Sequence, residues 1–99
     1  MTPSAGEFWL ADRGDETRRL VFVVSDSRFH RLAERAVVAP VLDEAPAQLR
    51  PWHISIGEER IIAVNLAGTV PTERLLERAD VVAGDALVRV RRAARAIIG

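Results

Sequence analysis

The sequence predicts a mainly β domain, a small barrel of roughly five to seven short strands followed by an amphipathic helix. Three observations support this fold class. Runs of branched and aromatic residues, each of strand length, recur along the chain, turn-forming residues separate them, and a helical apolar stripe occurs only at the C-terminal end. A chain of 99 residues has the size of one domain, so we expect residues 1–99 to form a single core.

The first two predicted strands lie near the N-terminus. Residues 6–12 contain the aromatic and branched side chains that favour a half-buried strand. A polar loop follows at 13–18. Arg19 then precedes the apolar run 20–24, which we expect to be the central strand, buried on both faces.

A short helical turn and a third strand come next. Apolar residues three positions apart predict one or two helical turns at 28–34. The run at 36–42 has strand composition, but Pro40 removes one ladder donor and therefore implies an edge or a bulge. Residues 43–51 are expected to form a loop.

The clearest local prediction is a β-hairpin. Apolar and polar residues alternate at 52–56, and a second strand pattern follows at 60–64. Gly57 and two acidic residues stand between them, which suits a hairpin loop of about three residues.

The C-terminal third ends in a helix. We expect a short strand at 67–70, helical turns at 72–77 and an extended piece at 80–83. Apolar residues then recur at helical spacing over 85–98, and Asp85 is placed to accept backbone N–H groups at the start of that helix.

Composition limits the function classes. Fourteen basic residues, all arginine, balance fourteen acidic ones, so nucleic-acid binding would have to come from a local patch or an oligomer groove. The absence of cysteine excludes a disulfide framework, a thiolate metal site and a thiol nucleophile. No secretory or membrane-spanning run is present, so we expect a cytoplasmic protein with no membrane contact, no metal and no cofactor.

Histidine and tryptophan each allow two interpretations. His30 and His53 are the only histidines, and each is either a packing or strand-face residue or a proton carrier. Trp9 and Trp52 are either core or dimer contacts, or aromatic platforms on which a base stacks.

Arg18 and Arg19 stand where a charged loop meets the central strand. A strand end holds a guanidinium rigidly, so such an arginine is suited to binding a phosphate. The alternative is a surface charge paired with Asp15 or Glu16.

Several motifs resemble the MazF/PemK toxins of type II toxin–antitoxin modules. Residues 6–12 read GEFWLAD and residues 19–25 read RLVFVVS, close to the family's opening two strands. The resemblance continues through 37–41, 61–65 and 69–75, in the family's order. It implies an SH3-like barrel with a C-terminal helix, acting as a homodimer that inhibits growth and is bound by a cognate antitoxin.

The resemblance further implies an endoribonuclease, or mRNA interferase. Members of this branch cut single-stranded RNA without metal, and 2′-hydroxyl attack leaves a 2′,3′-cyclic phosphate. Arg19 falls on the catalytic arginine, and His30 or His53 is the candidate for proton transfer. The residues that this hypothesis assigns to substrate binding are Trp9, Asp12, Thr17, Arg18, Ser25 and Asn65.

Other positions depart from the family pattern. Leu42 stands where the family places a catalytic threonine, Ala63 replaces an arginine, and Asn65–Leu66 replaces an acid and a glutamine. Two alternatives therefore stay open. One is a poison of DNA gyrase like the related CcdB toxins, with the C-terminal tip as its contact. The other is an inactive toxin paralogue that only binds an antitoxin.

Overall fold

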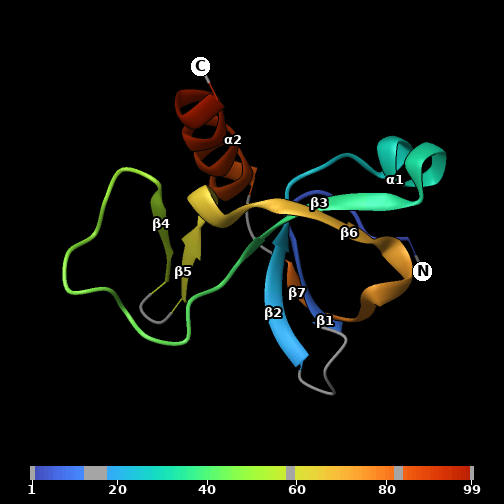
Figure 1. Ribbon diagram of the computed structural model, residues 1–99, viewed down its shortest axis with the longest axis horizontal. Coiled ribbons are helices and arrows are strands. Elements are labelled where there is room, and N and C mark those ends of the chain that lie inside the picture. The colour runs from blue at the N-terminus through green and yellow to red at the C-terminus, as the bar shows by residue number, and fades with distance from the viewer. Residues whose placement is uncertain (1, 13–17, 58–59, 82–83, 99) are drawn as a thin grey trace.

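The computed structural model describes residues 2–12, 18–57, 60–81 and 84–98 (Figure 1). Within them the chain is mainly β and ends in a helix, as predicted. The elements, in chain order, are β1 (Glu7–Asp12), β2 (Arg18–Val23), α1 (Ser27–Ala33), β3 (Arg35–Pro40), β4 (His53–Ile56), β5 (Arg60–Ala63), η1 (Val64–Leu66), β6 (Gly68–Pro71), η2 (Thr72–Arg74), β7 (Leu75–Val81) and α2 (Gly84–Ile98).

The strands form two antiparallel sheets. The larger sheet has the order β6-β3-β2-β1-β7, which confirms β2 as the central strand, and β4 and β5 form the predicted hairpin. A bridge between Val41 and Ile62 joins the hairpin to the chain leaving β3, and the Leu42 N–H donates to the Ile61 carbonyl at 2.9 Å. Figure 1 shows the hairpin and α2 at one end of the molecule and α1 at the other.

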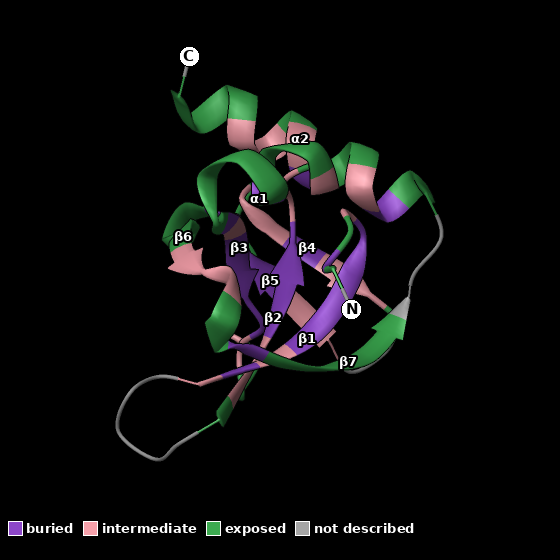
Figure 2. Cartoon of the chain, turned by 90° about the vertical axis from the view of Figure 1, so that its right-hand side faces the viewer, coloured by how far each residue is buried: buried purple, intermediate pink, exposed green. Residues whose placement is uncertain are grey.

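The larger sheet buries apolar side chains on both faces. Phe8 and Phe22 pack edge to face, with ring centroids 5.2 Å apart, in a cluster that includes Val90 of α2. Trp9 and Val21 belong to a second cluster, on the opposite face because side chains alternate along a strand. Figure 2 shows α2 crossing over the buried strands. The second face is therefore the one that α2 leaves uncovered.

Pro40 is the last residue of β3, which is an internal strand rather than an edge. The pairing of β3 with β6 ends at Val38, however, while its pairing with β2 continues to Pro40. The next residue, Val41, donates its N–H to Leu20 of β2 at 3.1 Å, so the ring nitrogen of Pro40 faces the side where β6 has ended. Pro40 therefore lacks an N–H group at a position where β3 no longer pairs with β6 and needs no donor on that side.

The prediction for residues 72–77 was wrong in part. A single 3-10 turn covers 72–74, and β7 begins at Leu75, which is buried. Most described side chains of this edge strand are exposed, so the alternation typical of a strand is weak. The last extended piece falls partly in β7, and its residues 82–83 lie outside the described ranges.

Arginines attach α2 to the sheets. Arg91 donates from Nε and Nη2 to the Val24 carbonyl at 3.3 and 3.0 Å, and Arg89 donates to the Ser55 carbonyl at 3.2 Å. Helix α2 begins one residue before its predicted start, with Asp85 in its first turn. Neither α-helix of the described ranges has the length and hydropathy that crossing a membrane requires.

Candidate functional site

Arg19 lines a cavity on the face of the larger sheet that α2 does not cover. We call it the Arg19 cavity; its volume is about 300 Å³. Its floor is made by side chains of β1, β2, β3 and β6, and its wall by η1 and η2. The lining residues are Ala11, Asp12, Arg19, Val21, Val38, Pro40, Leu66, Gly68, Thr69, Val70 and Arg74.

The Arg19 side chain lies against the sheet, but the described part of the sheet does not supply a hydrogen-bond acceptor for its Nε. The residue is half-buried, and its Nε is buried without a hydrogen-bond partner among the described residues. An unsatisfied buried donor costs about 1–3 kcal/mol. Because Arg19 lines the cavity, the site suits a phosphate or carboxylate oxygen of an anion seated there.

Leu42 lies just beyond the end of β3. The register between β2 and β3 ends at the pair Val21 and Pro40, and the Leu42 N–H donates to the Ile61 carbonyl of the hairpin at 2.9 Å. The position carries no hydroxyl. Ala63, the other departure from the family pattern, is 1% exposed and belongs to the hairpin.

Trp9 is a core residue. It is 3% exposed, and its indole Nε1 donates to the carboxylate of Glu7 at 3.1 Å. The prediction that Trp9 contacts substrate does not fit this placement, because almost none of the ring is accessible for stacking.

Ser25 and His30 form a hydrogen-bonded unit inside the fold. His30 is 3% exposed, its Nδ1 bonds the Pro3 carbonyl at 2.8 Å, and its Nε2 bonds the Ser25 hydroxyl. A carbonyl only accepts, so Nδ1 carries the proton and Nε2 accepts from Ser25. Ser25 Oγ also accepts from the Val37 N–H at 2.8 Å. This network ties the N-terminus to α1 and β3, and neither residue lines the Arg19 cavity.

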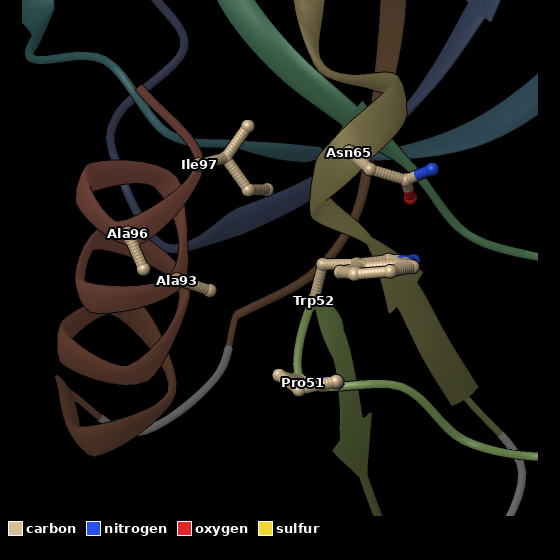
Figure 3. Close-up of a pocket in the computed structure, with 6 residues that line it drawn as sticks. All are labelled: Pro51, Trp52, Asn65, Ala93, Ala96 and Ile97. Atoms are coloured by element: carbon tan, nitrogen blue, oxygen red, sulfur yellow. The ribbon is translucent and has the colours of Figure 1, made fainter. Parts of the chain in front are cut away.

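Asn65 lies in a different cavity from Arg19. This second cavity has a volume of about 550 Å³ and is lined by Pro51, Trp52, Asn65, Ala93, Ala96 and Ile97. Figure 3 shows Trp52 and Asn65 on one side of this cavity and Ala93, Ala96 and Ile97 of α2 on the other. Asn65 and Leu66 are neighbours in η1, yet Leu66 lines the Arg19 cavity, so the 3-10 turn separates the two sites.

The remaining predicted residues are spread over the molecule. Asp12 lines the Arg19 cavity, and Arg18 is exposed opposite it in the β1–β2 register. His53 accepts a hydrogen bond at Nδ1 from the Arg50 N–H at 2.9 Å and lies in the hairpin. Thr17 falls outside the described residues.

Two further contributors to the Arg19 cavity end the two 3-10 turns. Arg74, which ends η2, had no signal in the sequence that singled it out, and Leu66, which ends η1, was noted there only as a departure from the family pattern. Both reach the cavity only because β6 returns beside β3 and brings the two turns to that face. The described residues contain no group of three or more His, Cys, Asp or Glu side chains suited to a metal ion.

The fold and the cavity define a small antiparallel β protein in which a half-buried arginine lines a cavity on one face of the sheet. A family model described as the PemK-like, MazF-like toxin of type II toxin–antitoxin systems matches residues 4–98. The chain belongs to this toxin family. A search of curated proteins returned no match.

Solved toxin structures share the fold. A MazE–MazF complex from Deinococcus radiodurans superposes with a TM-score of 0.87 at 18% identity, covering 100% of this chain and 97% of that one. An endoribonuclease in complex with its cognate antitoxin, from a mycobacterial species, gives 0.85 at 15% identity, covering 98% and 95%. Mycobacterium tuberculosis toxin MazF-mt6 gives 0.74 at 10% identity, covering 93% and 95%.

Proposed function

We propose that this toxin is a metal-independent endoribonuclease that cleaves single-stranded RNA through Arg19. The observation that carries the proposal is Arg19, a half-buried cation that lines a cavity on the sheet face that α2 leaves uncovered. Membership of the PemK-like, MazF-like toxin family and the shared fold of an endoribonuclease support it. A phosphodiester oxygen is an acceptor that a guanidinium binds well.

The reaction is a transesterification. The 2′-oxygen of one nucleotide forms a bond to the adjacent phosphorus, the bond from phosphorus to the 5′-oxygen breaks, and the products are a 2′,3′-cyclic phosphate and a 5′-hydroxyl. Arg19 stays protonated and stabilises the phosphorane charge. Among the described residues that line the cavity, Asp12 is the carboxylate that accepts the 2′-hydroxyl proton, and water donates to the leaving oxygen.

The toxin acts as a cytoplasmic homodimer, and binding of an antitoxin keeps it inactive. Exposed apolar side chains of η1 and of the end of α2 supply a surface that water disfavours: Leu66 is 57%, Ile97 is 47% and Ile98 is 85% exposed. A cognate antitoxin is supported by the toxin–antitoxin complexes among the structural neighbours. Sedimentation of the purified chain is expected to give a dimer, and a monomer at working concentration would contradict this part.

The activity test uses purified protein and a mixed-sequence RNA in excess EDTA. We expect the wild type to cut at a defined short sequence and to leave 2′,3′-cyclic phosphate ends. Arg19→Ala is expected to be inactive, whereas Arg92→Ala, on the exposed face of α2, is expected to match the wild type. Intact RNA with the wild type contradicts the proposal.

The gyrase alternative depends on the exposed Ile97 and Ile98 at the end of α2. DNA supercoiling assays separate it from the nuclease: inhibition of gyrase by the purified toxin would favour it over RNA cleavage. An inactive paralogue would be excluded if expression of the toxin without its antitoxin arrested growth.

A further inference from the structure

Arg19 and Arg74 reach the same cavity from two different elements. Arg19 belongs to β2 and Arg74 ends the 3-10 turn η2. Aliphatic side chains, among them Val21, Val38 and Val70, line the cavity together with the two guanidiniums. The Arg19 cavity therefore combines an apolar floor with two cationic groups.

The charge of Arg74 is not used by the fold. Arg74 is exposed and has no hydrogen bond or ion pair with any residue in the described ranges. Other arginines are engaged by the protein: Arg35 bonds Thr69, Arg60 pairs with Asp80, Arg78 pairs with Glu7, and Arg89 and Arg91 bond backbone carbonyls. Removing the Arg74 charge should therefore leave the stability of the domain nearly unchanged.

We infer that Arg74 binds a second phosphate of the RNA, next to the one that Arg19 holds, so that one nucleotide lies over the aliphatic floor. This inference rests on the proposed nuclease function. A single strand repeats a phosphate at every nucleotide, and grooves that hold it follow the backbone with positive charge. Phosphate contacts set the register of the strand and carry no sequence information. Arg74 is thus a positioning residue, and Arg19 is the catalytic one.

The test measures binding of an uncleavable 2′-O-methyl oligonucleotide of the cleaved sequence as a function of salt. Arg74→Gln is expected to weaken binding about tenfold and to lower the slope of log K against log salt by about 0.7, the value for one phosphate contact on a single strand. Arg74→Lys keeps the charge and should restore the slope. Arg92→Gln, on α2 and on the other side of the sheet, is the matched control and should change neither value.

Kinetics separate this role from catalysis. With cleavable RNA, Arg74→Gln should raise KM while kcat stays close to the wild-type value, and the loss should be the same for different sequences. Wild-type affinity and slope in Arg74→Gln, with the wild type cleaving RNA normally, would overturn this inference alone. Failure of the wild type to bind or cut any RNA would overturn the nuclease proposal as well.

Discussion

Glu7 accepts a hydrogen bond from the indole Nε1 of Trp9, two residues along the same face of β1, at 3.1 Å. The same carboxylate accepts from the Ser4 N–H at 2.7 Å and pairs with Arg78 of β7 at 3.2 Å. One buried carboxylate thus joins the N-terminal segment, the core tryptophan and the edge strand. The contact explains why an acid is tolerated at a position that is only 8% exposed.

This network makes stability depend on pH. Burial opposes ionisation of Glu7, but the hydrogen bonds from Ser4, Trp9 and Arg78 outweigh burial and lower the pKa of Glu7 below its ordinary value of 4.5. The stabilisation is therefore complete above about pH 4.5 and is lost as the pH falls through the lower pKa of the folded state. Glu7→Gln should cost about 1 kcal/mol at neutral pH and flatten the loss in acid, as measured by Tm against pH.

The exposed Glu77→Gln is the control, since it changes the same charge on β7. Identical Tm curves for the two variants would contradict a stabilising role for Glu7.

His30 is predicted to stabilise the fold without taking part in cleavage. His30→Ala removes one buried and one partly buried hydrogen bond and should lower the free energy of unfolding by about 2–3 kcal/mol. Chemical denaturation measures this loss, and a double-mutant cycle with Ser25→Ala should show coupling of about 0.5 kcal/mol or more. A large fall in kcat with unchanged stability would instead assign His30 to proton transfer.

Leu42→Thr is predicted to increase cleavage. The family resemblance puts a catalytic threonine at position 42, one residue after Val41, whose N–H donates to the Leu20 carbonyl next to Arg19, and a hydroxyl there would add a donor for the phosphate. One hydrogen bond to a charged group is worth about 1.5 kcal/mol, so kcat should rise about tenfold. Leu42→Val has nearly the same shape as threonine without the hydroxyl and is the control. Equal rates in the two variants would show that the hydroxyl contributes nothing.

Glu34→Asn is predicted to raise stability. Glu34 ends α1 in the left-handed region, with φ 56°, where asparagine is better tolerated than glutamate. The gain should be about 0.5 kcal/mol. Thermal unfolding beside Glu44→Asn, an exposed loop position, checks the prediction. A Tm no higher than the Glu44→Asn value would contradict it.

The sequence predicted those elements whose pattern is local. The hairpin and α2 were found because alternation and helical spacing are visible within a few residues. The first part of β7 was taken for helical turns because most of the described side chains of this strand face water and, among them, Leu75 alone is buried. Its identity depends on pairing with β1, which lies at the other end of the chain.

The same distinction applies to the site. Arg19 was predicted because it adjoins a buried strand. Arg74 was not, since only the return of β6 beside β3 brings η2 to the cavity. Asn65 was grouped with Arg19, but the 3-10 turn places it at the second cavity. A one-turn element of this kind leaves no periodic signal.

The most direct measurement is single-turnover cleavage of one RNA that contains the preferred sequence, by the wild type, Arg19→Lys and Arg19→Ala. The account predicts full activity for the wild type and no detectable activity for the alanine variant. The lysine variant should lose most of its activity, because a point charge replaces a planar fork. All three should bind the uncleavable analogue, the alanine variant more weakly. Cleavage by Arg19→Ala at the wild-type rate would contradict the account.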